Sequence, residues 1–147
     1  MAKTYFEDIP MGWKQDMGRW PLTAESIIAF ARDWDPQPFH IDEDAARQSI
    51  YGSLTASSLH LFAICTRLFF DHGSGIAVLA MLGKDAVRFP NPARAGSELR
   101  YTTECTSARA SKSKTDRGIV TLSDTLCDES GATVLSQEVN LLLARRS

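Results

Sequence analysis

A carboxylate and an imidazole lie close together in a segment that contains two prolines. The segment runs from Asp35 to His40 and reads Asp-Pro-Gln-Pro-Phe-His. Each proline ring fixes its own φ angle and keeps the preceding residue out of the helical region, so residues 35–39 are expected to form a rigid loop. A carboxylate beside a histidine can hold one water, remove its proton and return a proton to carbon. The pair therefore indicates acid–base chemistry on an activated double bond.

Gly52 is a further candidate, because it directly precedes the strongest helical segment, residues 53–72. A backbone N–H at the start of a helix lacks a partner within the helix and lies at the positive end of the helix dipole. Such an N–H can polarise a carbonyl oxygen, and glycine lets a substrate approach the backbone closely. The alternative interpretation is that Gly52 only lets the chain turn into the helix.

The first half of the chain predicts the helices that position these residues. Thr23 can cap a helix over residues 24–31, and Asp42 can cap a short helix that ends by about residue 49. Residues 53–72 carry apolar side chains on most faces, which predicts a buried central helix.

The second half of the chain predicts strands. They are expected at residues 76–82, 85–89, 98–108, 118–127 and 133–143. The short connections between them contain turn residues, and no intervening helix is long enough for a parallel crossover, so antiparallel pairing is favoured. The sequence therefore predicts an α+β fold in which an antiparallel sheet wraps around the central helix.

The composition is that of one compact domain over residues 1–147. Of these residues 44% are hydrophobic, and 16 Lys and Arg against 18 Asp and Glu give a net charge of −2, so no general positive field attracts nucleic acid. Residues 1–10 are acidic where an export signal would be basic and then apolar. The apolar stretch at residues 59–70 contains Arg67 and is too short to span a bilayer. We therefore expect a cytoplasmic protein with no membrane or nucleic-acid partner.

These residues resemble the MaoC-like dehydratases, a branch of the hotdog superfamily that includes the R-specific enoyl-CoA hydratases. The hydratase motif of that family runs Asp-x-Asn-Pro-x-His, followed by a glycine-containing entry to the central helix and an Ala-Ser pair. This chain has the segment from Asp35 to His40 and then Gly-Ser-Leu-Thr-Ala-Ser at residues 52–57. The resemblance implies that Asp35 and His40 are catalytic and that the Gly52 N–H binds the thioester oxygen.

The similarity extends over nearly the whole chain, because residues 88–97 and 111–118 also look like the family. Two positions depart from its pattern. Trp34 stands where the hydratases usually have Gly, and Gln37 stands where they usually have Asn. These changes leave the catalytic pair intact and leave the acyl preference open.

The resemblance implies a hydro-lyase of hotdog fold that interconverts an enoyl thioester and a 3-hydroxyacyl thioester of coenzyme A. Coenzyme A is then part of the substrate, and no separate cofactor is expected. A homodimer or larger homo-oligomer is expected as well, because a lone sheet leaves its edges open. The alternatives are a hotdog acyl-CoA thioesterase and a non-catalytic acyl-CoA-binding subunit, although the presence of both Asp35 and His40 argues against the latter.

Five further residues are candidates for substrate binding. Ser57 and His60 lie near the start of the predicted central helix and can line the pocket, although helix packing explains both equally well. Lys112, Lys114 and Arg117 surround a turn and can contact the phosphates of coenzyme A. A solvated turn is the alternative for these three.

No metal site is expected from the sequence. Asp35, His40 and Asp42 are not accompanied by further ligands at a recognised spacing. The 3 cysteines are odd in number and far apart, so we interpret them as reduced packing residues.

Overall fold

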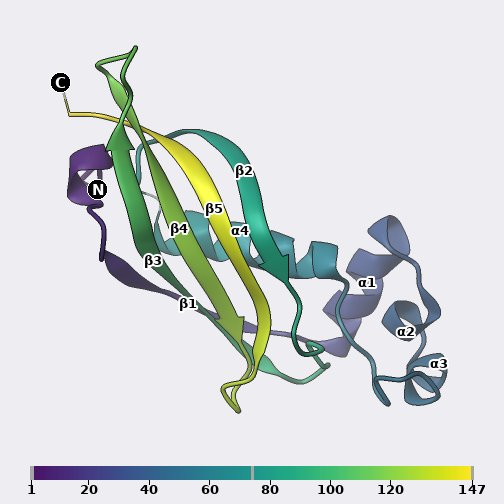
Figure 1. Ribbon diagram of the computed structural model, residues 1–147. Coiled ribbons are helices and arrows are strands. Elements are labelled where there is room, and N and C mark those ends of the chain that lie inside the picture. Colours follow the sequence, from purple (N-terminus) through teal and green to yellow (C-terminus); the bar gives the residue numbers. More distant parts are fainter. Residues whose placement is uncertain (1, 74, 147) are drawn as a thin grey trace.

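A computed structural model describes residues 2–73 and 75–146. A five-stranded antiparallel sheet curves around the long helix α4, while the short helices α1 to α3 gather at one end of the sheet (Figure 1). In chain order the elements are the 3-10 helix η1 (Phe6–Asp8), β1 (Lys14–Pro21), α1 (Ala24–Trp34), α2 (Pro38–Ile41), α3 (Glu43–Arg47), α4 (Ser58–His72), β2 (Val78–Arg88), β3 (Glu98–Ala110), β4 (Arg117–Cys127) and β5 (Thr133–Ala144). This arrangement confirms the predicted α+β hotdog fold.

The sheet has the strand order β1-β3-β4-β5-β2, so that β1 and β2 form its edges. The sequence did not predict β1, because Met17 is the strand's one fully buried residue and the apolar alternation is therefore weak. The two strands predicted at residues 76–82 and 85–89 form a single strand, β2. Its pairing with β5 is irregular, and Ala86 has a φ of 51°, which explains why the pattern seemed interrupted.

Two predicted helix caps are confirmed at the end of the molecule that carries the short helices. The Thr23 hydroxyl accepts a hydrogen bond from the Ser26 N–H at 3.1 Å and starts α1. The Asp42 carboxylate accepts from the Asp44 N–H at 2.9 Å and starts α3. Both caps satisfy N–H groups that have no partner within the helix.

The central helix α4 begins at Ser58, whereas the sequence predicted a start at residue 53. Residues 54–56 are held in an extended conformation by the loop that precedes β3. The Ala56 N–H donates to the Ala93 carbonyl at 2.9 Å, and the Ala95 N–H donates to the Leu54 carbonyl at 3.0 Å. These bonds join segments that are far apart in the sequence, so apolar periodicity alone could not place the start of the helix.

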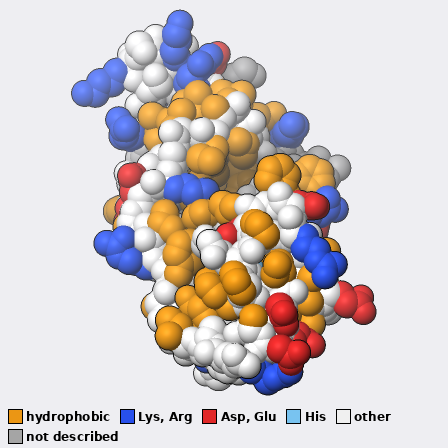
Figure 2. Space-filling view, turned by 90° about the vertical axis from the view of Figure 1, so that its right-hand side faces the viewer, with side chains coloured by type: hydrophobic (Ala, Val, Ile, Leu, Met, Phe, Trp, Pro, Cys, Tyr) orange, Lys and Arg blue, Asp and Glu red, His pale blue; other side chains and the backbone are white. Residues whose placement is uncertain are grey.

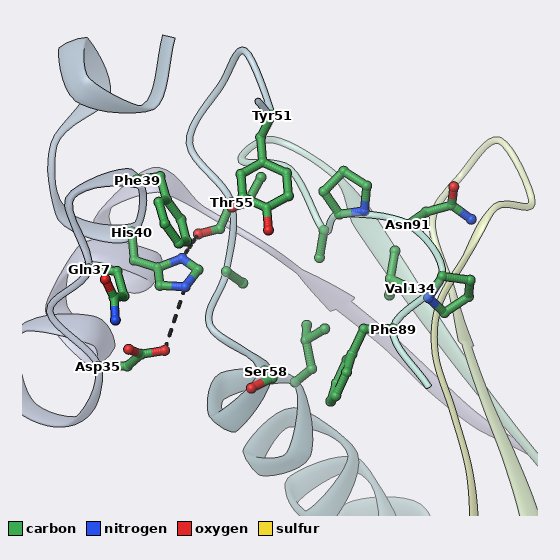
Figure 3. A pocket seen from close by; sticks show the side chains of 15 residues that line it. Asp35, Gln37, Phe39, His40, Tyr51, Thr55, Ser58, Phe89, Asn91 and Val134 are labelled. Carbon is green, nitrogen blue, oxygen red and sulfur yellow. Dashed lines mark hydrogen bonds and ion pairs between the residues drawn. The ribbon is translucent and has the colours of Figure 1, made fainter. Parts of the chain in front are cut away.

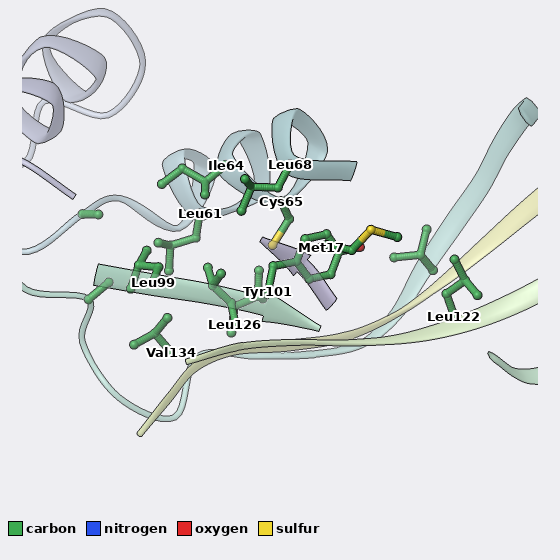
Figure 4. Close-up of a cluster of buried hydrophobic side chains, with 14 of the residues drawn as sticks. Met17, Leu61, Ile64, Cys65, Leu68, Leu99, Tyr101, Leu122, Leu126 and Val134 are labelled. Atoms are coloured by element: carbon green, nitrogen blue, oxygen red, sulfur yellow. The ribbon is translucent and has the colours of Figure 1, made fainter. Parts of the chain in front are cut away.

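One face of α4 packs against the sheet and forms the core (Figure 4). Buried side chains on this face recur at helical spacing: Leu61, Ile64, Cys65 and Leu68. The prediction of a helix buried on nearly all sides is wrong. Leu59 and Phe70 are 45% and 63% exposed on the other face of the helix.

An apolar surface follows the β2 edge of the sheet. Its exposed large side chains on and just after β2 are Val78, Leu79, Met81, Leu82 and Phe89. Figure 2 looks at the side of the molecule on the right of Figure 1, where hydrophobic side chains occupy much of the middle of the face. Within the described ranges, none of the helices combines the length and apolar character that crossing a membrane requires.

Candidate active site

A cleft of about 440 Å³ lies where α2 and the start of α4 face the loop after β2 (Figure 3). The cleft is lined by Asp35, Gln37, Phe39, His40, Tyr51, Thr55, Ala56, Ser58, Leu61, Phe89, Pro90, Asn91, Pro92, Ala93 and Val134. The structure therefore brings the two side chains with the strongest chemical signal in the sequence into one cavity.

Asp35 is held by the end of α1, and His40 is held by the short helix α2. The Asp35 N–H donates to the Ala31 carbonyl at 2.8 Å and closes the last turn of α1. Pro38 occupies the first turn of α2, where a missing N–H costs nothing. The segment predicted to be a loop thus contains one helical turn, which restricts the movement of His40.

The two side chains face each other across a short gap. His40 Nε2 lies 3.5 Å from Asp35 Oδ2, and their side chains are 9% and 26% exposed. His40 Nδ1 lies 2.6 Å from the Thr55 carbonyl oxygen. A carbonyl oxygen can only accept, so Nδ1 carries a proton and donates it. In the neutral ring Nε2 then presents a lone pair toward the carboxylate and the cleft.

A third polar group fixes the carboxylate. The Ser57 hydroxyl donates to Asp35 Oδ2 at 2.8 Å and accepts from the Leu59 N–H at 3.2 Å. Ser57 is fully buried and is absent from the lining of the cleft. It therefore holds Asp35 against the first turn of α4 and lies outside the cleft lining, whereas the sequence analysis had placed it among the residues that line the pocket.

The spacing within the pair suits a shared water. A separation of 3.5 Å is longer than a direct hydrogen bond, which usually spans about 2.7–3.2 Å. A water oxygen can lie about 2.8 Å from both Asp35 Oδ2 and His40 Nε2. Such a water would be polarised by two acceptors inside a cleft where little bulk solvent competes. The arrangement can therefore activate water or receive it from a substrate.

Gly52 does not lie at the start of the central helix, and this corrects the structural basis of its predicted role. It occupies a turn with a φ of 69°, and its N–H donates to the Ser49 carbonyl at 3.1 Å. Gly52 is exposed to solvent and is not among the residues that line the cleft. The sequence misplaced it because the helix starts later than the apolar pattern indicates.

Ser58, and not Gly52, provides the backbone N–H at the start of the central helix that the sequence analysis expected. It is the first residue of α4 and lines the cleft beside Asp35 and His40. The Ser57 hydroxyl caps the Leu59 N–H, and no acceptor among residues 2–73 and 75–146 takes the Ser58 N–H. This N–H lies at the positive end of the α4 dipole, where it can bind a carbonyl oxygen.

His60 is buried on the side of α4 that faces α1, outside the lining of the cleft. Its ring stacks on Phe30 with the centroids 4.6 Å apart. Burial lowers the pKa of His60 below its usual value, so the ring is neutral at pH 7. Packing between α1 and α4 accounts for this residue.

The basic turn of Lys112, Lys114 and Arg117 lies at the opposite end of the sheet from α1 to α3 (Figure 1). Arg117 begins β4, an 11-residue strand that is therefore about 35 Å long. Near the other end of β4, Leu126 pairs with Leu135 of β5, and the preceding residue of β5, Val134, lines the cleft. The turn and the cleft thus lie near opposite ends of β4, and contact of this turn with coenzyme A stays a prediction.

Sequence reasoning assigned no role to the residues that form the wall facing the pair. Phe89, Asn91 and Val134 lie across the cleft from Asp35 and His40 in Figure 3. The Asn91 amide donates to the Thr133 carbonyl at 2.9 Å and ties this wall to β5. A signal was present, because Asn91 stands between two prolines, as polar residues of rigid functional loops often do. The described residues contain no cluster of three His, Cys, Asp or Glu side chains that could hold a metal ion.

Known proteins match the chain over most of its length. A family model described as MaoC like domain matches residues 10–126. The crystal structure of a MaoC-like dehydratase from Rhodospirillum rubrum is 36% identical in sequence and superposes with a TM-score of 0.90, covering 98% of this chain and 99% of that one.

Two further matches are more distant in sequence or cover less of the matched protein. The protein MaoC of Klebsiella aerogenes is 31% identical over 104 residues, which cover 70% of this chain but only 31% of that protein. The unliganded R-hydratase PhaJ1 from Pseudomonas aeruginosa is 19% identical and has a TM-score of 0.77, covering 99% of this chain and 88% of that one. The last likeness shows a shared fold alone.

Proposed function

The chain belongs to the MaoC-like domain family, and from this membership and the geometry of the cleft we propose that it is a cytoplasmic hydro-lyase acting on acyl-CoA thioesters. It would interconvert an enoyl thioester and a 3-hydroxyacyl thioester. The observation that carries the proposal is the pair of Asp35 and His40, separated by 3.5 Å in a cleft beside the start of α4. The MaoC-like dehydratase from Rhodospirillum rubrum, which is 36% identical over 98% of this chain, supports the same reaction class.

In the hydration direction, Asp35 and His40 hold the attacking water between them. As the water oxygen bonds to C3, the pair removes a proton from it, and the electrons of the C2–C3 double bond move toward the thioester carbonyl. The resulting enolate then takes a proton at C2 from the pair. One water is added in total, and dehydration is the same sequence in reverse.

The negative charge that develops on the thioester oxygen needs a hydrogen-bond donor in place. We assign this role to the Ser58 N–H, since it lies at the positive end of α4 and Ser58 lines the cleft. A preorganised backbone donor stabilises such an oxyanion without reorganising during the reaction. The side chain of Ser58 is not required for this interaction.

The proposal is tested by incubating the purified protein with a panel of enoyl-CoA thioesters and identifying the products. We expect 3-hydroxyacyl-CoA and no free thiol. Release of free coenzyme A with a free acid would instead identify a thioesterase. Binding of the thioesters without either product would identify a non-catalytic acyl-CoA-binding protein, and both outcomes contradict the proposal.

We expect Ser57→Ala to affect stability and turnover together. Loss of the α4 cap should lower the free energy of unfolding by about 1 kcal/mol. Loss of the hydrogen bond to Asp35 should also lower kcat more than it raises KM, since Asp35 would no longer be held in place. Urea denaturation and steady-state kinetics measure the two effects. Thr23→Ala is the control, because it removes the cap of α1 without contacting Asp35; an equal loss of kcat in both variants would contradict the positioning role.

We further propose that two copies of the chain associate through the apolar surface along β2. This strand is an unpaired edge of the sheet and exposes Leu79 and Leu82 by 51% and 53%. Unprotected edges and large apolar patches mark association sites in monomer structures. A second copy presents an identical edge and can pair with it symmetrically.

Light scattering should therefore give at least twice the 16.2-kDa mass of one chain at micromolar concentration. Introducing Lys at both Leu79 and Leu82 should produce a monomer, because charged side chains block edge pairing. Placing Lys at the exposed Ile50, which lies outside β2, is the matched control and should leave the mass unchanged. A stable wild-type monomer would refute this proposal.

A further inference from the structure

A second cavity, of about 230 Å³, lies further along the face of α4 that lines the cleft. Leu61 lines the cleft, whereas Cys65 and Phe69 line the second cavity one and two helical turns later. The walls are mostly apolar and come from α4, β2 and the inner face of the sheet. A water molecule occupies about 30 Å³ in the liquid, so this space is large enough for several atoms of a ligand.

A chain of polar side chains closes one wall of this otherwise apolar space. Lys84 Nζ donates to Gln137 Oε1 at 3.0 Å, and Gln137 Nε2 donates to Asp124 Oδ2 at 2.9 Å. The other oxygen of Asp124 accepts from the Thr103 hydroxyl at 2.8 Å. The two carboxylate oxygens are therefore occupied by donors of the sheet, and Gln137 separates the carboxylate from the ammonium group.

The Lys84 ammonium group has unused hydrogen-bonding capacity. It has three N–H donors, and within the described ranges it donates one hydrogen bond, to Gln137. It also lies 5.0 Å from the centre of the Phe62 ring. Partial burial lowers the pKa of Lys84, an effect that the nearby Asp124 carboxylate opposes, and burial raises the pKa of Asp124. An anionic ligand group would satisfy the free donors and stabilise the ammonium charge.

Phe62 lies at the boundary between the two cavities. Its ring makes an edge contact with Phe89, which lines the cleft, at a centroid distance of 5.6 Å. The same ring is the neighbour of Lys84, which lines the second cavity. A ligand that enters the cleft beside Asp35 and His40 would therefore reach Lys84 by passing Phe62. Phe62 thus contacts one residue of each cavity, which makes its ring the group that separates them.

We propose that the second cavity receives the far end of the acyl group and that Lys84 binds a carboxylate there. The inference rests on the proposed function and narrows its substrate class to enoyl thioesters that carry a second, terminal carboxylate. Gln137 and Asp124 hold the ammonium group in place, and the apolar walls contact the methylene groups between the thioester and the carboxylate. An uncharged acyl chain would offer the Lys84 ammonium group no hydrogen-bond acceptor.

The test compares the binding of two saturated thioesters of equal chain length, glutaryl-CoA and pentanoyl-CoA, by titration calorimetry. Neither has a C2–C3 double bond, so neither can be hydrated, and binding is measured apart from turnover. Wild-type protein should bind glutaryl-CoA at least about tenfold more tightly, as expected for a charge-assisted hydrogen bond in a poorly solvated site. Lys84→Met should abolish this preference and leave the affinity for pentanoyl-CoA within about twofold of the wild type.

Lys112→Met is the matched control, because it removes the same charge from the exposed turn at the far end of the sheet and should leave the preference intact. Lys84→Gln is a second variant, for the case that Lys84→Met disturbs folding by breaking the hydrogen bond to Gln137. It should lose the preference for glutaryl-CoA as well. Equal affinity of the wild type for both thioesters, or a preference that survives in a folded Lys84 variant, would overturn the inference. A clear preference without hydration of any enoyl-CoA would instead refute the proposed function; the carboxylate site at Lys84 would stand, but not the substrate class inferred from it.

Discussion

Asp35→Asn should lower kcat for hydration of a good enoyl-CoA substrate by at least about 10²-fold, the lower bound typical of a lost general acid or base. The amide keeps the size of the carboxyl group and can still accept from the Ser57 hydroxyl, but it cannot take a proton from water. Thioester binding should survive, because the carboxylate acts on the water. The measurement is steady-state kcat, together with circular dichroism to verify folding.

His40→Ala should cause a loss of similar size, because it removes the second proton-transfer group of the pair. The two side chains hold the same water, so the double variant should be little slower than the slower single variant. Strict additivity of the two losses would show that Asp35 and His40 act on different steps.

Asp33→Asn is the matched control for the charge change. Asp33 lies on the same helix end as Asp35, but it is exposed and absent from the cleft. It should therefore retain the turnover of the wild type. If folded Asp35→Asn and His40→Ala also retained near wild-type turnover, the active site assigned to this cleft would be wrong.

Ser58→Pro should lower kcat by about 10²- to 10³-fold, the loss typical of one oxyanion donor. Proline removes the Ser58 N–H together with the side-chain hydroxyl. The first position of a helix tolerates proline, because its N–H makes no bond within the helix. The preceding residue, Ser57, has φ −60° and ψ 146°, a conformation that proline favours in its neighbour. The fold and the cap of α4 should therefore survive.

Ser58→Ala separates the backbone from the side chain. It removes the hydroxyl but keeps the N–H, so turnover should remain within a few fold of the wild type. Gly52→Pro is not informative about this donor, since the Gly52 N–H is already bonded to Ser49. A folded Ser58→Pro variant with unchanged kcat would show that another group stabilises the thioester oxygen, and an equal loss in Ser58→Ala would implicate the hydroxyl.

Local features of the sequence were sufficient to predict that Asp35 and His40 lie together and to predict much of the fold. Two prolines constrain the segment from Asp35 to His40, so the close approach of its two functional side chains depends little on the rest of the chain. The caps at Thr23 and Asp42 depend on bonds to residues two or three positions away. The strands β3, β4 and β5 were predicted well, because buried residues alternate along them.

Features that depend on contacts between segments far apart in the chain could not be predicted from local sequence patterns. The start of α4 moved to Ser58 because residues 54–56 pair with the loop before β3, and the predicted oxyanion donor moved with it. The edge strand β1 has little apolar alternation of its own and is held by its bonds to β3.

The sequence by itself thus determined that Asp35 and His40 lie close together, where α1 and α3 are capped, and where the antiparallel strands run. Each of these features depends on backbone dihedral preferences, residue spacing or periodicity within a few residues. Only the tertiary structure decided that α4 begins at Ser58 beside the cleft, that Ser57 holds Asp35, and that the basic turn after β3 lies at the other end of the sheet. It also placed Lys84 beside a second cavity on the face of α4 that lines the cleft. The physical reason is that hydrogen bonds and packing between β-strands and α4 join residues many positions apart, and no local pattern encodes those distances.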